Sequence, residues 1–280
     1  MSPRRLAMTL SRGEMRKLLA DNGIKPSRAL GQNFVADPNT VRRIARLASV
    51  GPGDRVVEIG AGLGSLTLAL AETGADVMAI EMDRYLLPVL RSVVAPSGVR
   101  VIETDAMAMD WRTVLGAESG WVLVANLPYN VATPLILDVL DQVPAIERML
   151  VMVQREVGER LAAEPRTRAY GAVSVKVAYW ATARVVGRVP ASVFIPAPRV
   201  ESVLVSIQRR PAPGVDPDVV PASELFALVT AGFAHRRKML RRSLLGVVDE
   251  KAFACAAVDP SARAEELDVE AWGRLAACRT

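Results

Sequence analysis

Histidine, cysteine and aromatic residues are scarce in this chain of 280 residues, and each shortage excludes a class of site. The single histidine, His235, excludes any site that requires two imidazoles. The two cysteines, Cys255 and Cys278, lie near the C-terminus without the spacing of a metal site, so we expect free thiols in a reducing cytosol. Aromatics make up only 5% of the chain, so the core must consist mainly of small aliphatic side chains. The sequence therefore predicts no metal centre.

A long uninterrupted apolar run is also missing. The longest uncharged stretch, residues 121–137, is broken by asparagines and prolines, so it does not read as a membrane span. The first 19 residues carry charges and have no apolar segment of the length found in signal peptides. We therefore expect a cytoplasmic protein that does not associate with membranes.

The chain is nevertheless rich in aliphatic residues and in arginine. Apolar residues make up 51% of a length that suits one α/β domain with a smaller second domain. The net charge is +5, and the basic residues are 30 arginines against 5 lysines. Arginine favours bidentate contacts with phosphate, but a basic composition alone indicates a nucleic-acid partner only weakly.

Strand-length apolar runs alternate with segments of helical apolar spacing, which predicts a mostly parallel sheet with helices on both faces. A helix and two further strands are expected after residue 160, and a proline-rich stretch at 209–223 marks the expected domain linker. We therefore divide the chain into a basic N-terminal extension (1–24), an α/β domain (25–210) and a helical C-terminal domain (211–280). The expected strands of the α/β core are 55–59, 76–81, 99–103, 121–126 and 149–154.

The first expected strand leads into a glycine loop, EIGAGLGS at 58–65. Gly60, Gly62 and Gly64 let the backbone turn sharply and let a ligand approach the next helix. The spacing is G-x-G-x-G, and Ser65 stands where the dinucleotide-binding fingerprint requires glycine. A plain tight turn would use the same residues, so the loop alone is weak support for a ligand site.

Two acidic residues at later strand ends strengthen the ligand interpretation. Glu81 follows Gly60 by 21 positions, where an acid can accept both hydroxyls of a ribose. Asp105 follows the third strand and is placed to accept from an adenine amino group. Both could instead be ordinary polar strand ends. Because parallel strands end at one edge, the pattern predicts an adenosine-containing ligand and favours S-adenosylmethionine over NAD.

The fourth strand ends in NLPYNV, residues 126–131, which combines acceptors with an aromatic ring. The side-chain oxygen of Asn126 and the carbonyl of Leu127, directed by Pro128, offer two acceptors to an exocyclic amine with two hydrogens. Tyr129 offers a face on which a base can stack. Drawing both protons of an adenine N6 toward acceptors localises its lone pair toward a methyl donor, so alignment does most of the chemistry. A structural turn is the competing interpretation.

Nine segments in fixed order resemble the small-subunit rRNA adenine N6,N6-dimethyltransferases, the kasugamycin-resistance family, over about residues 25–245. The resemblance implies a class I, Rossmann-like methyltransferase fold with a mostly parallel seven-stranded sheet and a small helical C-terminal domain. It implies dimethylation of two adjacent adenines in the 3′-terminal hairpin loop of small-subunit rRNA, within a late 30S assembly intermediate, by a monomer. The segments are GQNFV, VVEIGAGLGSLT, IEMD, TDAM, NLPYNV, QREVGERL, RAYGAVSV, FIPAPRVES and HRRKMLRRSL.

The same resemblance implies roles for single residues. Tyr129 and Phe194 would sandwich the flipped target base. Two residues depart from the family pattern, Val35 where leucine is usual and Ala61 where proline is common, and neither removes a polar contact. The residues implied to contact S-adenosylmethionine are Asn33, Val35, Gly60, Gly62, Glu81, Asp105 and Asn126, and those implied to act on the target amine are Asn126, Leu127, Pro128 and Tyr129.

Basic residues gather at both ends of the chain. The segment 235–244 is expected to be helical and to anchor RNA phosphates, with the solvated face of a helix as the alternative. One hypothesis is that the N-terminal extension orders only when RNA or cofactor binds. The expected phosphate contacts are Arg236, Arg237, Lys238, Arg241 and Arg242.

Other functions fit the sequence less well. A large-subunit rRNA adenine methylase of the macrolide-resistance type shares the glycine loop and an N-x-P-Y motif. A catalytically silent rRNA-binding assembly factor would be expected to have lost Asn126, Tyr129 or Glu81, and all three are present. An oxidoreductase is disfavoured because no hydride-transfer site is evident. A DNA methyltransferase is disfavoured because a separate sequence-reading domain is lacking. The sequence therefore favours an rRNA-modifying enzyme.

Overall fold

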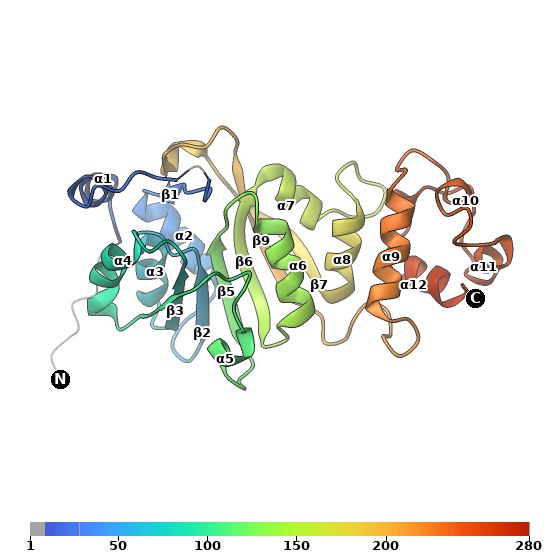
Figure 1. Cartoon of the computed structure of the whole chain (residues 1–280), viewed down its shortest axis with the longest axis horizontal. Coiled ribbons are helices and arrows are strands. Elements are labelled where there is room, and N and C mark those ends of the chain that lie inside the picture. Colours follow the sequence, from blue (N-terminus) through green and yellow to red (C-terminus); the bar gives the residue numbers. More distant parts are fainter. Residues whose placement is uncertain (1–8, 28, 280) are drawn as a thin grey trace. The chain divides into compact units, whose positions relative to one another are not determined.

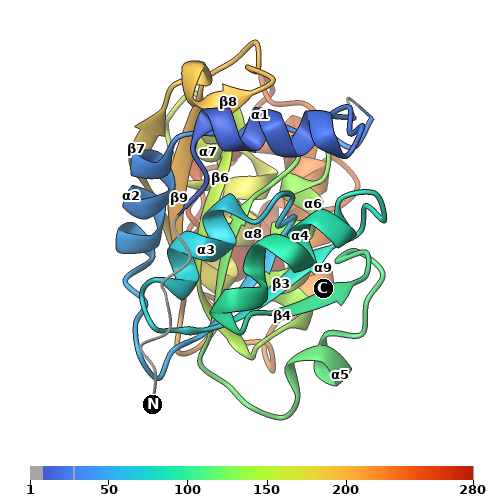
Figure 2. The same ribbon diagram turned by 90° about the vertical axis from the view of Figure 1, so that its left-hand side faces the viewer.

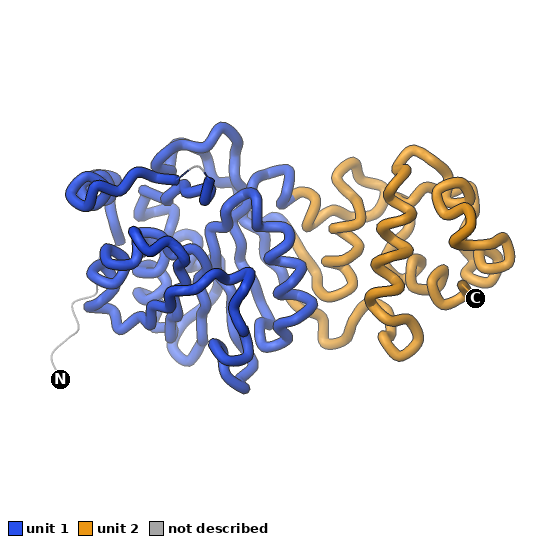
Figure 3. Tube along the Cα trace, in the orientation of Figure 1, with its two compact units in different colours: residues 1–158, 185–207 blue, residues 159–184, 208–280 orange. Residues whose placement is uncertain are grey.

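The computed structural model describes residues 9–27 and 29–279. The chain forms two compact units, residues 1–158 with 185–207, and residues 159–184 with 208–280 (Figure 3). This division differs from the expected boundary at 210/211, because residues 159–184 group with the C-terminal helices. Among the described residues, no helix is long and apolar enough to cross a lipid bilayer.

A seven-stranded sheet is the centre of the first unit (Figure 1). Five neighbouring strands of the sheet, β4, β3, β2, β5 and β6, pair in parallel, as the alternating pattern predicts. The bounds of β2, β3 and β5 coincide with the predicted strands, because a parallel strand buried on both faces is apolar along its whole length. The sheet order is β4 (Arg100–Glu103), β3 (Asp76–Glu81), β2 (Arg55–Ile59), β5 (Trp121–Asn126), β6 (Ile146–Gln154), β9 (Ser202–Arg209) and β7 (Ala181–Val189).

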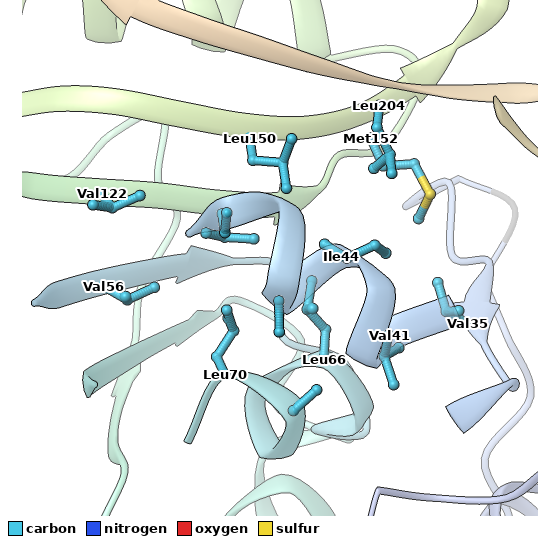
Figure 4. Packing of buried hydrophobic residues seen from close by; sticks show 14 of the residues in the cluster. Val35, Val41, Ile44, Val56, Leu66, Leu70, Val122, Leu150, Met152 and Leu204 are labelled. Carbon is cyan, nitrogen blue, oxygen red and sulfur yellow. The ribbon is translucent and has the colours of Figure 1, made fainter. Parts of the chain in front are cut away.

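Helices cover the sheet. Helices α2 and α3 pack over one face, where Val56, Val122 and Leu150 from three strands meet Ile44 and Leu66 (Figure 4). Helix α6 contacts β6, and alternate residues of the strands are buried toward its side. The helices between the strands are α2 (Pro38–Ala48), α3 (Ser65–Ala71), α4 (Leu87–Val94), α5 (Trp111–Leu115), α6 (Ala132–Gln142) and α7 (Arg155–Leu161), with 3₁₀ turns at Ala95–Ser97 and Ala191–Val193.

The N-terminal segment belongs to the folded core of the first unit. Helix α1 (Arg12–Asp21) begins with a capping box formed by Ser11 and Glu14. Met15 is fully buried in the same cluster as Phe34, so α1 packs into the core of the first unit. That the N-terminal extension orders only when RNA or cofactor binds stays a hypothesis. The basic residues before position 9 lie outside the described residues.

A small second sheet follows α1. Strand β1 (Phe34–Val35) pairs antiparallel with β8 (Phe194–Ile195). The guanidinium of Arg12 donates to the carbonyls of Ser192 and Phe194, so α1 lies beside β8, as Figure 2 shows. The Ile195–Pro196 peptide bond is cis.

The second unit is helical, as predicted, and has its own core. Tyr179 of α8 packs edge-on against Phe226 of α9 with ring centroids 5.2 Å apart, and Trp272 of α12 is fully buried. Because α8 buries its apolar face against other helices, its residues join the C-terminal unit. The helices are α8 (Ala172–Trp180), α9 (Ala222–Phe233), α10 (Leu240–Ser243), α11 (Glu250–Cys255) and α12 (Val269–Ala277), with a 3₁₀ turn at Ala264–Glu266.

Two expectations for the second unit are corrected. The basic segment is not one helix: α9 ends at Phe233, and the backbone N–H groups of Leu240 and Arg241 donate to the 260–262 loop instead of to the preceding helical turn. Cys255 and Cys278 are joined by a disulfide rather than being free thiols, since the fold places their Cα atoms 5.9 Å apart.

Substitution of Met15 tests whether α1 is part of the core. We expect Met15→Ala to lower the free energy of unfolding by about 2–5 kcal/mol, because it removes a fully buried side chain. The neighbouring Arg16→Ala, at an exposed position, should change it by less than about 0.5 kcal/mol. Urea unfolding of the ligand-free protein measures both, and equal effects would show that α1 does not contribute to the core.

Candidate active site

A pocket lies at the carboxyl ends of β2, β3 and β5, as the switch-point rule predicts for an open α/β sheet. Each strand contributes a predicted residue at its end, and segment 29–34 forms another wall. Because the strands are parallel and in register, residues far apart in the sequence meet at this edge. The predicted residues that line the pocket are Asn33, Gly60, Gly62, Glu81, Asp105, Asn126, Leu127, Pro128 and Tyr129.

The glycine loop needs glycine for its backbone shape. Gly60, Gly62 and Gly64 have φ values of 72°, 60° and 85°, in the left-handed region that side chains disfavour. The amide of Gly60 donates to the carbonyl of Ile80 (2.9 Å), which fastens the loop to β3. A Cβ at Gly62 would lie 3.0 Å from the ring of Phe34, so the loop backbone and the N-terminal wall pack closely. Gly60 and Gly62 line the pocket, and a cofactor-binding role for the loop stays a prediction.

Glu81 is the buried acid of the site. Its Oε2 accepts from the amide of Gly62 (2.8 Å), and its Oε1 accepts from the amides of Met82 (2.9 Å) and Asp83 (2.8 Å). Burial raises the pKa of Glu81, and these amides oppose that rise. A carboxylate has about four acceptor positions, so about one remains, on Oε2. In this conformation Glu81 can accept one ribose hydroxyl rather than the two expected.

Asp105 also lines the pocket, after β4, whose end pairs with the end of β3 at Glu81. Its Oδ1 accepts from the amide of Met107 (2.9 Å), which fixes the turn, and the side chain is exposed. The exposed Met82 and Met107 also line the pocket. An acceptor beside apolar walls suits an adenine, because the ring packs against apolar atoms while its amino group donates.

The side chain of Asn126 is oriented by the N-terminal wall. Its Nδ2 donates to the backbone carbonyl of Asn33 (2.9 Å). This hydrogen bond assigns the positions of Nδ2 and Oδ1 in the side-chain amide and leaves Oδ1 as the acceptor. Leu127 is held in turn by donation from its amide to the carbonyl of Met152 (3.1 Å). The amide and the following carbonyl are therefore positioned by the fold.

The position of Tyr129 is set by the turn that contains it and by a contact of its hydroxyl with β9. The carbonyl of Pro128 accepts from the amides of Val131 (3.2 Å) and Ala132 (3.1 Å), which ends the turn and starts α6. The hydroxyl of Tyr129 lies 3.2 Å from that of Ser202, a buried residue at the start of β9. The tyrosine lines the pocket with its ring partly accessible.

Two predicted residues do not line the pocket. Val35 is 5% exposed and Phe194 is 2% exposed, and both lie in the core cluster beneath α2. The reason is the pairing of β1 with β8, which sets Val35 opposite Phe194 and turns both side chains into the core. In this conformation Phe194 offers no free face to a base, so the structure does not bring it together with Tyr129.

A second buried carboxyl lies beneath the glycine loop. Glu58 of β2 is 1% exposed, and its Oε2 has no hydrogen-bond partner among the described residues. Burial raises the pKa of Glu58 to about 8, and the negative charge of Glu81 contributes in the same direction. Glu58 is therefore protonated at neutral pH, which removes a second negative charge from the base of the pocket.

The basic residues of the second unit form a different cluster from the one expected. Arg236 donates to the carboxylate of Glu265 (2.7 Å) and to the carbonyl of Arg168 (2.7 Å), so it is a structural residue. Arg237, Lys238, Arg241 and Arg242 are exposed. A shallow pocket here is lined by Arg166, Thr167, Arg168, Arg236, Arg237, Arg263 and Glu265. Sequence reasoning missed three of these arginines because they come from two separate loops with no charge run.

Within residues 9–27 and 29–279, no group of three or more His, Cys, Asp or Glu side chains is arranged to hold a metal ion. A site that positions an amine and a methyl donor has no step that calls for a metal ligand set. The absence of a metal requirement stays a prediction.

The fold and the pocket together define a Rossmann-like methyltransferase. The structure resembles that of the 23S rRNA methyltransferase ErmE (TM-score 0.69, 26% identity, covering 88% of this chain and 99% of that one). It also resembles a dimethyladenosine transferase from Plasmodium falciparum (TM-score 0.71, 22% identity, covering 85% and 94%), which supports the fold alone.

The family follows from the sequence comparisons. The family model for ribosomal RNA adenine dimethylase matches residues 23–278, and the chain belongs to that family. Ribosomal RNA small subunit methyltransferase A of Thermobifida fusca is 46% identical over 96% of both chains. The protein of the same name from Kineococcus radiotolerans is 47% identical over 98% of this chain and 93% of its own.

Glu58 gives the protein a testable pH dependence. Its folded pKa of about 8 exceeds the ordinary value of 4.5, so the folded state holds more protons between these values and the free energy of unfolding falls as pH rises. The slope should be at most about 1.4 kcal/mol per pH unit. Denaturation of wild type and Glu58→Gln at pH 5 to 8 measures it. The variant should have a flatter profile, and parallel profiles would contradict the assignment.

Proposed function

We propose that the protein is an rRNA (adenine-N6,N6)-dimethyltransferase that uses S-adenosylmethionine to dimethylate two adjacent adenines in the 3′-terminal hairpin loop of small-subunit rRNA. Membership of the ribosomal RNA adenine dimethylase family supports the reaction class. The observation that carries the proposal for the site is the fixed amide of Asn126, whose acceptor oxygen belongs to a pocket shared with Gly60 and Glu81.

The pocket residues fit S-adenosylmethionine. Gly60 and Gly62 line the pocket without side chains, and a side chain at Gly62 would collide with the ring of Phe34. The remaining acceptor of Glu81 would take a ribose hydroxyl, and Asp105 would take the adenine amino group. When bound, the cofactor supplies an electrophilic methyl group on a positively charged sulfur. The carboxylates of the pocket favour that charge.

The target amine would be held by acceptors from the turn after β5. The Asn126 oxygen and the Leu127 carbonyl would each accept one N6 hydrogen, and Tyr129 would stack on the base. Because the amide of Asn126 and the backbone of Leu127 are already fastened, the acceptors need little rearrangement when the base arrives. Phe194 would join the stack only after leaving the core.

The arginine pocket of the second unit is proposed to anchor the RNA backbone. Arg166, Arg168, Arg237 and Arg263 surround a single acid, Glu265, which is already engaged by Arg236. Guanidinium groups bind phosphate oxygens in pairs, so such a cluster suits consecutive backbone phosphates. The exposed Lys238, Arg241 and Arg242 would add further contacts.

The fold does not separate the two rRNA adenine methylase types, because the ErmE structure and the dimethyladenosine transferase structure match it about equally well. Sequence identity separates them better, at 46% to small-subunit methyltransferases and 26% to ErmE. A silent assembly factor is disfavoured by the complete site. A late 30S intermediate as the partner, a monomeric state and a cytoplasmic location are part of this proposal.

Methylation of small ribosomal subunits tests the proposed reaction. Purified protein and labelled S-adenosylmethionine are added to subunits from a strain without the dimethylase, and the RNA is digested to nucleosides. We expect about two N6,N6-dimethyladenosines per subunit. Asn126→Ala should lower the rate by about 100-fold or more, in the range seen when a preorganised polar contact to the transition state is removed.

The result is read against a matched control. Asn22→Ala removes an amide from an exposed position at the end of α1 and should leave the rate unchanged. Cofactor binding without transfer to the subunits would overturn the enzyme proposal for this substrate. If a parallel reaction on large ribosomal subunits incorporates label and the small-subunit reaction does not, the macrolide-resistance type is favoured.

The arginine pocket is tested by the salt dependence of RNA binding. Each lost phosphate contact lowers the slope of log K against log salt by about 0.7 to 0.9. We expect Arg168→Ala and Arg237→Ala each to reduce the slope by about this amount and to weaken binding at low salt. Arg16→Ala, an exposed arginine of α1, is the control. Unchanged slopes for both pocket variants would remove the phosphate role.

A further inference from the structure

The side chain of Gln32 joins two segments that lie 51 residues apart in the sequence. Its Nε2 donates to Oδ2 of Asp83 (2.7 Å), and its Oε1 accepts from the amide of Ser27 (2.8 Å). The amide of Gln32 donates in addition to the carbonyl of Ser27 (3.0 Å). Gln32 therefore closes the loop in which it lies and fastens that loop to the turn after β3.

Both of the joined segments are walls of the proposed cofactor pocket. Gln32 and Asn33 line it from the N-terminal segment, and Glu81 and Met82 line it from the end of β3. Asp83 is itself fixed, because its Oδ1 accepts from the amide of Tyr85 (2.9 Å) and its amide donates to Glu81 (2.8 Å). The hydrogen bond between Gln32 and Asp83 thus connects the wall that carries Asn33 to the wall that carries the ribose acid.

The N-terminal wall depends on side-chain contacts for its position. Its neighbouring strand β1 is only two residues long. Gly31 packs against Pro128, where an added Cβ would lie 3.0 Å from the proline Cβ, and Asn33 accepts from Asn126 (2.9 Å). These contacts hold the wall to the turn after β5, and Gln32 holds it to the turn after β3, which carries Asp83. Without Gln32, the wall would have to become ordered on that side when the cofactor binds.

We propose that Gln32 is a positioning residue that keeps the two walls together around the bound cofactor, slows its release and preorganises Asn33. The proposal rests on the proposed function, namely that this pocket binds S-adenosylmethionine. A wall that is already ordered lowers the entropic penalty of binding. The fastened wall also presents the Asn33 carbonyl that orients Asn126, so loosening it should affect both cofactor affinity and transfer.

A pair of substitutions that exchange amide and carboxylate tests the contact directly. Gln32→Glu places two carboxylates against each other. Asp83→Asn leaves one oxygen where the wild-type carboxylate has two, one for Tyr85 and one for Gln32. In the combined Q32E/D83N protein, the new amide at position 83 can accept from Tyr85 and donate to the new carboxylate, which still accepts from Ser27. Every hydrogen bond of the wild type then has an equivalent.

Calorimetric titration of the full chain with S-adenosylmethionine, without RNA, measures the effect. We expect each single variant to bind about tenfold more weakly, in line with loss of a hydrogen bond to a charged group, and to release the cofactor faster. The combined variant should recover to within about threefold of wild type. A merely structural role would give weakened binding without this recovery, which would overturn the proposal.

Gln142→Glu is the matched control, because Gln142 also donates to an aspartate, Asp141, but at the exposed end of α6. It should bind like wild type. If wild type binds and both single variants bind equally well, the positioning role fails and the cofactor assignment stands. If wild type itself does not bind S-adenosylmethionine, the cofactor assignment and the positioning role both fail.

Discussion

The buried carboxylate of Glu81 is the interaction on which the arrangement of the site depends. It accepts from the glycine loop at Gly62 and from the turn at Met82 and Asp83, so one side chain fixes the ends of two neighbouring strands. Burial raises its pKa, and three amide donors oppose that rise in part. The protonated Glu58 nearby spares the site a second buried charge. The fold thus fastens the glycine loop and the turn after β3 to a single buried side chain.

The sequence predicted the parts of the fold that local pattern determines. Buried parallel strands are apolar along their length, and the glycine loop and NLPY motif fall at strand ends by position alone. Gly60 and Asn126 were therefore expected at one edge of the sheet, and both line the pocket there, while their roles stay predictions. Val35 and Phe194 were expected in the pocket but lie in the core, because their orientation depends on pairing between segments some 160 residues apart. No local pattern encodes that pairing.

In the C-terminal unit, too, contacts between distant segments decide what the sequence pattern did not predict: the path of the basic segment, the arginine pocket and the state of the two cysteines. Residues 235–244 look helical in isolation, but α9 ends at Phe233 and a separate short helix, α10, begins at Leu240. The amides of Leu240 and Arg241 donate to a later loop. The arginine pocket is assembled from three loops, one of which holds Arg166 at a positive φ of 68°, so its charge cluster does not exist in the sequence. The sequence predicted free thiols at Cys255 and Cys278, which was wrong, because packing of α11 against α12 brings the two cysteines together.

The two halves of the proposed reaction meet at one backbone group, the carbonyl of Asn33. It belongs to the wall that would contact the cofactor, and it also accepts from the amide that would receive the target amine. Under the proposed function, a displacement of this wall would turn the Asn126 amide and would also disturb a bound cofactor. Cofactor binding that stabilises the wall would sharpen the acceptor geometry before a base arrives. The coupling requires no large movement, because a single hydrogen bond of 2.9 Å transmits it.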